Sequence, residues 1–172
     1  MFCVCTAYMN DTLSPPIRTR GDVAEDVSHT MIHANPAGVL VIGASRRLGA
    51  TFTRALVESR YRVFLGARNE QQLRAHAESI ERSFEMRTEW SRVDLRSADE
   101  CSTFVAAAES HLGGIDVLIN NAGVGSYKPL TEWLRDKIVD TLALNLDAAM
   151  LLARGVLPRM LARACDRGIN HR

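Results

Sequence analysis

The feature that most constrains the fold is a strand–loop–helix unit in residues 39–56, VLVIGASRRLGATFTRAL. Residues 39–42 form a short, β-branched apolar run, which predicts a strand buried on both faces. A loop of small residues follows at 43–49, and one-sided apolar spacing predicts a helix over 48–60. Small residues in such a loop let the backbone approach a phosphate, and the helix N-terminus supplies N–H donors. The alternative interpretation is an ordinary strand–helix turn.

The rest of the chain continues to alternate between strand and helix signals. Asn69 and Ser97 are suitable N-caps, and Gly113-Gly114 ends a helix. Alternation of this kind predicts an α/β fold, a Rossmann-type doubly wound parallel sheet of order 3-2-1-4 in chain numbering. The further expected strands are 61–65, 86–93 and 115–120, and the further expected helices are 69–82, 97–111 and 131–160, the last broken once.

Composition narrows the function classes. The formal net charge of +1 gives no reason to expect nucleic acid or an anionic membrane as a partner. No apolar run approaches the roughly 18–20 residues of a membrane span. The four cysteines form no C-x-x-C pair and no disulfide framework, which predicts reduced thiols and a cytoplasmic location. The five histidines show no metal-ligand spacing, so no metal site is expected.

The first 36 residues differ from the remainder. They contain Pro15, Pro16 and Pro36, scattered charges of both signs, and no helical or strand period. No basic segment precedes an apolar stretch, so a signal peptide is not indicated. Residues 1–36 are therefore predicted to be a flexible tail, and 37–172 a nucleotide-binding Rossmann domain that is incomplete at its C-terminus. Whether translation starts at Met1 or Met31 stays open.

A second motif, Asn120-Asn121-Ala122-Gly123, lies at the end of the fourth expected strand. With the loop at 43–49, it resembles the short-chain dehydrogenase/reductase family, which carries T-G-x-x-x-G-x-G and N-N-A-G at these places. The first motif departs from the pattern twice. Ile42 replaces the threonine, and Arg47 replaces the middle glycine, as in the pteridine-reductase-like variant T-G-x-x-x-R-x-G. The resemblance covers about residues 38–165.

The resemblance implies a dinucleotide site and assigns its contacts. Asp94 would meet the adenine amino group, Leu95 would line the adenine pocket, and Asn145 would support the active-site lysine through water. The full set of implied cofactor contacts is Gly43, Ser45, Arg46, Arg47, Leu48, Gly49, Arg68, Asp94, Leu95, Asn121, Ala122 and Gly123.

The choice of cofactor follows from charge. NAD-preferring sites usually place an acid at the end of the second strand, on the ribose hydroxyls. This chain has Arg68 there and no acid before Glu70. Guanidinium groups of Arg46, Arg47 and Arg68 would suit a 2′-phosphate, which favours NADP(H) over NAD(H). Alternatively, these arginines are solvated surface charges.

The catalytic groups implied by the resemblance are missing from the sequence. In the family, a tyrosine exchanges the proton, a lysine lowers its pKa and a serine positions the substrate oxygen. The chain has no Tyr-x-x-x-Lys; Tyr127 and Lys128 are adjacent, which is the wrong spacing for mutual reach on a helix. Two hypotheses follow. The chain is the cofactor-binding portion of an NADP(H)-dependent carbonyl/alcohol oxidoreductase, inactive alone, or it is a non-catalytic dinucleotide-binding or interaction module.

The sheet and its last helix are expected to be poorly covered. Residues 117–119 would form an exposed apolar edge, which is a template for association. The leucine-rich helix over 131–160 would lose part of its cover. Self-association through this edge strand and long helix is therefore predicted.

Overall fold

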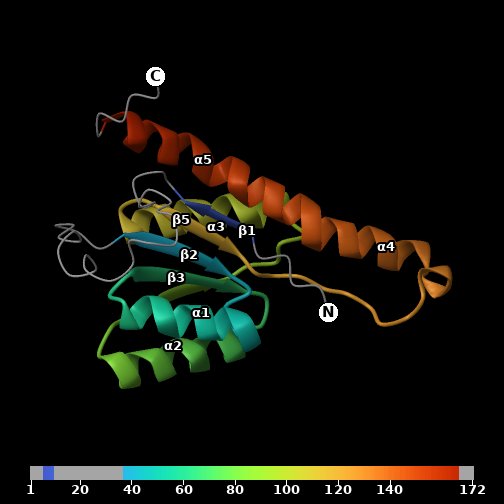
Figure 1. Ribbon diagram of the computed structural model, residues 1–172, viewed down its shortest axis with the longest axis horizontal. Helices are drawn as coiled ribbons and strands as arrows, with labels where there is room; N and C mark the ends of the chain where they lie inside the picture. The colour runs from blue at the N-terminus through green and yellow to red at the C-terminus, as the bar shows by residue number, and fades with distance from the viewer. Residues whose placement is uncertain (1–5, 10–36, 167–172) are drawn as a thin grey trace, which may run out of the picture.

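Four parallel strands form the centre of the molecule. The structure is a computed structural model that describes residues 6–9 and 37–166. The strands are β2 (Gly38–Ile42), β3 (Arg62–Ala67), β4 (Glu89–Arg92) and β5 (Val117–Asn120), arranged in the order β5-β2-β3-β4. The predicted order 3-2-1-4 is confirmed. Leu40 of β2 lies in register between Phe64 of β3 and Leu118 of β5, so the apolar runs meet at the middle of the sheet (Figure 1).

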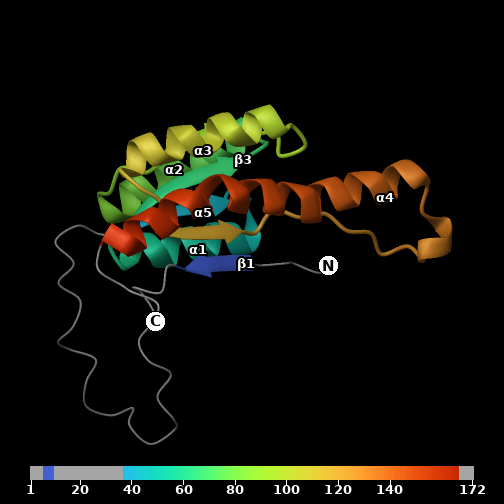
Figure 2. The ribbon, with the colours of Figure 1, turned by 90° about the horizontal axis from the view of Figure 1, so that it is seen from above.

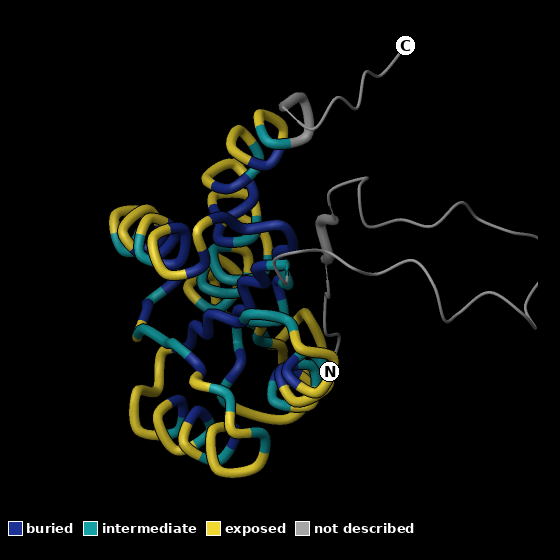
Figure 3. Tube along the Cα trace, turned by 90° about the vertical axis from the view of Figure 1, so that its left-hand side faces the viewer, coloured by how far each residue is buried: buried dark blue, intermediate teal, exposed yellow. Residues whose placement is uncertain are grey.

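Helices cover both faces of this sheet. α1 (Arg47–Glu58) and α2 (Glu70–Phe84) pack on one face, whereas α3 (Ala98–Leu112) and α5 (Ala148–Asp166) pack on the other. All five residues of β2 are buried, as a strand covered on both faces requires. Alternate β2 side chains therefore enter two separate cores, one on each face, and Figure 3 shows the buried segments running between the helical layers.

The predicted helix caps are present. The Asn69 side chain accepts a hydrogen bond from the backbone N–H of Gln72, at 2.9 Å, and the Ser97 hydroxyl accepts one from Glu100, at 3.2 Å. Gly113 ends α3 with a φ of +63°, a left-handed conformation that glycine adopts without strain. The Glu100 carboxylate does not complete a capping box. Instead it accepts the backbone N–H of Asp94 at 2.8 Å and so fixes the loop between β4 and α3.

The long helix predicted over 131–160 is broken more than once. A short 3-10 helix, η2 (Leu130–Glu132), precedes α4 (Arg135–Leu142), and a π-helical turn, η3 (Ala143–Asp147), joins α4 to α5. By length and composition alone, Arg135–Arg163 is long and apolar enough to cross a membrane, although the sequence pattern predicted no span. Its α5 part packs Leu152, Val156 and Met160 into the core against α3.

The edge of the sheet differs from the prediction. Residues 117–119 were expected to form an open edge, but β1 (Thr6–Met9) pairs antiparallel with β5, with Thr6 opposite Asn120 and Met9 opposite Val117. The expectation of an exposed edge is therefore wrong. It failed because four residues of the N-terminal segment supply the missing ladder. The rest of the predicted tail, residues 1–5 and 10–36, lies outside the described residues.

Candidate functional site

A cleft of about 680 Å³ opens at the carboxyl ends of the parallel strands. It lies where the chain order reverses between β2 and β5, the place at which open α/β sheets bind ligands. Apart from Gly49, every residue assigned to the cofactor from sequence lines it. Its lining is Gly43, Ser45, Arg46, Arg47, Leu48, Ala67, Arg68, Asn69, Gln72, Val93, Asp94, Leu95, Arg96, Asn121, Ala122, Gly123, Val124 and Leu144.

The phosphate loop is held by the neighbouring strands. The backbone N–H groups of Gly43 and Ala44 donate to the carbonyl of Gly66, at 2.8 and 3.2 Å. The Asn121 side chain donates to the carbonyl of Gly43 at 3.1 Å, which joins the loop at 43–49 directly to the segment at 120–123. Gly43 has a φ of +74°. A Cβ on Gly49 would lie 2.6 Å from the Asn121 amide nitrogen, so Gly49 allows close packing behind the loop rather than contact with a ligand.

The N-terminus of α1 is open to an anion. Its N-cap, Arg46, makes no side-chain cap hydrogen bond, and its first turn contains no acid. By contrast, α2 and α3 each have a side-chain cap and an acidic first turn. The first N–H groups of a helix need partners from outside the helix and carry positive partial charge. This end of α1 therefore has the polarity that a dinucleotide phosphate requires.

Three arginines surround this end of the cleft. Arg46, Arg47 and Arg68 all line it and are all exposed. Arg47 has a φ of +50°. For a residue with a side chain, such a backbone costs on the order of 1–3 kcal/mol and persists at functional sites. Arg47 thus keeps a side chain at this position although its backbone conformation is strained.

The opposite side of the cleft is formed by the loop after β4. Asp94 accepts a hydrogen bond at Oδ1 from the backbone N–H of Arg96, at 3.2 Å. The Arg96 guanidinium approaches the same oxygen at 3.6 Å, and its Nε donates to Oδ1 of Asp140 in α4 at 2.5 Å. This bond from Arg96 holds the pKa of Asp140 below its ordinary value, with smaller effects from the charges of Lys137 and Arg68. The pKa of Arg96 is raised, chiefly by the same bond.

Asn145 lies in η3 and does not line the cleft. Its side-chain oxygen accepts the backbone N–H of Val124 at 2.8 Å, and its side-chain nitrogen donates to the carbonyl of Val124 at 2.7 Å. The amide is therefore committed to the segment that follows N-N-A-G. π-helical turns often mark functional sites. The support of a lysine through water stays a prediction.

The tyrosine and lysine pair lies outside the cleft. Tyr127 is 89% exposed, and neither it nor Lys128 lines the cleft. The backbone carbonyl of Lys128 accepts a hydrogen bond from the Trp133 indole at 3.0 Å. That these two residues have no catalytic role stays a prediction.

Sequence reasoning missed several residues of the site. Gln72 lies in the first turn of α2 and lines the cleft, and its Oε1 is buried without a hydrogen-bond partner among the described residues. The only local signal was its position four residues after Arg68. His76 lies one turn further along α2. Burial and, to a smaller extent, the positive charge of Arg54 lower the pKa of His76, which favours a neutral imidazole.

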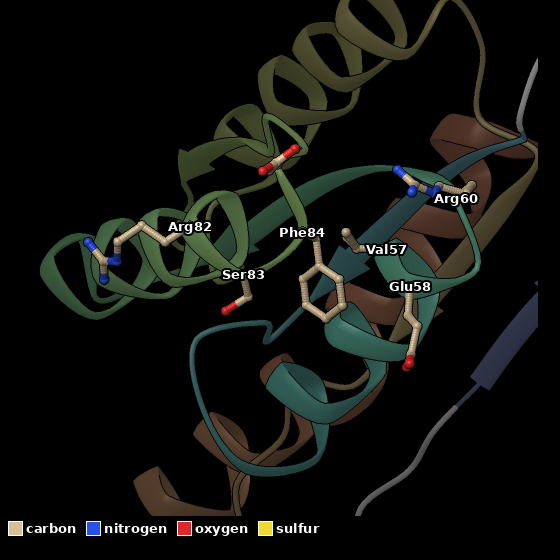
Figure 4. A pocket seen from close by; sticks show the side chains of 7 residues that line it. Val57, Glu58, Arg60, Arg82, Ser83 and Phe84 are labelled. Atoms are coloured by element: carbon tan, nitrogen blue, oxygen red, sulfur yellow. The ribbon is translucent and has the colours of Figure 1, made fainter.

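A second hollow, of about 380 Å³, lies between the C-terminal ends of α1 and α2. Figure 4 shows the Phe84 ring next to Val57, with the Arg82 side chain extending away from them. Arg54 stacks over the Phe84 ring at 5.3 Å. None of the residues assigned to the cofactor lines this hollow.

Comparison with known proteins decides the family. The short chain dehydrogenase family model matches residues 37–169. The chain belongs to the short-chain dehydrogenase family. Among solved members, a metagenomic short-chain oxidoreductase in complex with NADP is 35% identical, with a TM-score of 0.70, over 75% of this chain and 58% of that one. L-sorbose reductase from Gluconobacter frateurii, solved with NADPH and L-sorbose, is 29% identical, with a TM-score of 0.71, over 76% and 49%.

A curated relative covers the same part of the chain. Gluconate 5-dehydrogenase from Gluconobacter oxydans is 32% identical over 137 residues, which are 78% of this chain and 52% of that protein. The chain thus spans about half the length of the short-chain dehydrogenase relatives that it matches.

Proposed function

We propose that this chain is the cofactor-binding portion of an NADP(H)-dependent oxidoreductase that interconverts carbonyls and alcohols. The observation that carries the proposal is the cleft at the open N-terminus of α1, with Arg46, Arg47 and Arg68 on its rim. No acid lies at the end of β3 to accept the ribose hydroxyls of NAD. Solved relatives bound to NADP or NADPH support the same cofactor.

The residues present fit that cofactor in three parts. Gly43, which lines the cleft, and the uncapped start of α1 would hold the pyrophosphate. The arginines that line the cleft would take the 2′-phosphate. Asp94 would accept from adenine. When bound, the cofactor supplies or takes a hydride; the chain's own residues bind and orient it.

We propose further that this chain alone is inactive. A tyrosine with its ordinary pKa near 10 is a poor proton donor or acceptor at pH 7 unless a nearby cation lowers that pKa. The exposed Tyr127 lies outside the cleft, and the sequence has no Tyr-x-x-x-Lys. No tyrosine or lysine therefore lines the cleft in the part of the chain that the structure describes.

The test is a titration of the full chain with NADPH and NADH, followed by a turnover assay. We expect saturable binding that is tighter for NADPH, and no NADPH oxidation with a panel of aldehydes and ketones. Turnover would refute the inactivity of the chain. Failure to bind either nucleotide would refute the cofactor assignment.

The alternative function is a non-catalytic dinucleotide-binding or interaction module. The exposed apolar side chains along α4, η3 and α5 favour it, because contiguous apolar patches mark interaction surfaces. A longer natural chain with the family's serine and Tyr-x-x-x-Lys would favour the enzyme. In either case a reducing compartment such as the cytoplasm suits Cys101, which is buried and free.

We propose that this apolar surface mediates self-association. Met150 is 63% exposed and Leu161 is 61% exposed, and they lie about three turns apart on one face of α5. We expect sedimentation to show a mass that rises with concentration, and a shift toward monomer when both become lysine. Glu78→Lys, on the exposed face of α2, is the control and should leave the mass unchanged. A wild-type chain that stays monomeric and unfolds cooperatively would contradict the proposal.

A further inference from the structure

The position of α4 depends on very few contacts. None of its residues is buried, and Figure 2 shows it projecting beyond the sheet. Most helices are held in place by an apolar face packed on the core. Among the described residues, α4 has one side-chain bond to an element outside the helical segment it belongs to, the bond from Arg96 to Asp140 at 2.5 Å.

Arg96, which donates that bond, lies on the side of the cleft that is proposed to hold adenine. Arg96 lines the cleft, and both of its contacts with Asp94 use Oδ1, one through its backbone N–H and one through its guanidinium. No described residue takes Oδ2 of Asp94. The backbone N–H of Asp94 is fixed separately by Glu100. Asp94 is therefore oriented with one carboxylate oxygen left for a ligand.

We propose that the bond between Arg96 and Asp140 acts as a latch. It joins α4 to the adenine wall of the cleft, which is the loop after β4 that carries Asp94. Arg96 is thereby the positioning residue for Asp94. Guanidinium groups prefer to bind a carboxylate through two parallel hydrogen bonds. Asp140 draws the Arg96 guanidinium toward α4 and so prevents a two-pronged pair with Asp94. Without Asp140, Arg96 closes on Asp94 and competes with the exocyclic amino group of adenine. Without Arg96, Asp94 loses its orientation.

The latch also couples two parts of the site. Asp140 precedes η3, the turn that places Asn145 against Val124. The bond between Arg96 and Asp140 thus fixes the position of the adenine wall relative to the segment after N-N-A-G. The role of Asp94 toward adenine rests on the proposed function, whereas the attachment of α4 does not.

The first experiment needs no ligand. Amide hydrogen exchange of the full chain is compared for wild type, Asp140→Ala and Arg96→Met. We expect severalfold faster exchange across α4 in both variants, although alanine has the higher helix propensity and would by itself slow exchange. Glu78→Ala is the matched control, since it breaks a surface ion pair with Arg82 on α2. Unchanged exchange in α4 would refute the latch.

The second experiment separates positioning from attachment. Binding of 2′,5′-ADP, which carries the adenine, is compared with binding of reduced nicotinamide mononucleotide, which does not. We expect Asp140→Ala and Arg96→Met to weaken 2′,5′-ADP about tenfold, the loss of one charge-assisted hydrogen bond, and to leave the mononucleotide unchanged. Asp140→Glu should restore binding. Equal affinity in all variants would refute positioning. A wild type that binds neither probe would refute the proposed function and the positioning role together, while the exchange result still decides the attachment.

Discussion

Gly49→Ala should weaken NADPH binding at least about a hundredfold and destabilise the chain by about 1–3 kcal/mol, the usual range for overpacking a filled site. An added Cβ would meet the carbonyl of Gly43 and would lie 2.6 Å from the Asn121 amide nitrogen. Those two groups are hydrogen-bonded to each other, at 3.1 Å. The methyl group would therefore push apart the contact that joins the phosphate loop to N-N-A-G. Binding falls because the loop can no longer present its N–H groups at the required positions.

The measurement pairs urea unfolding with NADPH titration. Gly125→Ala is the control, because a Cβ there has nothing within 4 Å and Gly125 has no positive φ. It should leave both quantities unchanged. A Gly49→Ala chain that is folded at the titration temperature and binds NADPH with wild-type affinity would show that the loop does not contact the phosphates.

Arg68→Asp should reverse the preference between the two dinucleotides. Each charge-assisted hydrogen bond to the 2′-phosphate is worth about 1.5–3 kcal/mol, and an aspartate there adds repulsion. We expect NADPH to bind roughly a hundredfold more weakly, whereas NADH gains a carboxylate for its ribose hydroxyls. The measurement is the ratio of the two dissociation constants. A ratio near one in wild type, unchanged in the variant, would show that Arg68 is only a surface charge.

Arg47→Gly should change the stability of the chain and its preference for NADPH in opposite directions. Glycine adopts the φ of +50° without strain, so stability should rise by about 1 kcal/mol while the preference for NADPH falls. Glu85 has a φ of +53° at the end of α2, far from the cleft lining. Glu85→Gly should therefore raise stability by a similar amount and leave the preference unchanged.

Local signals in the sequence predicted most of the fold. Asn69 and Ser97 were recognised as caps because their chemistry acts within three residues, and the strand order followed from the chirality of crossovers. The contacts that were missed join distant residues. Nothing near Arg96 indicates Asp140, and nothing in residues 6–9 indicates β5.

The same distinction holds inside the site. Its members at strand ends could be predicted because parallel strands bring their carboxyl ends to one edge. Gln72 was missed because its burial depends on how α2 lies against the cleft. The dual bond of Asn145 to Val124 depends on a π-helical turn, which has no sequence signature of its own.

The pairing of β1 with β5 has a consequence for the order of events at the ribosome. Thr6 is made first and Asn120 follows only after β2, β3 and β4, so β1 leaves the exit tunnel long before its partner. At about 5–20 residues per second, that interval lasts on the order of ten seconds. During that interval β1 has no partner strand, so its unpaired backbone N–H and C=O groups are open to other chains, whereas β5 can pair with β1 as soon as it emerges.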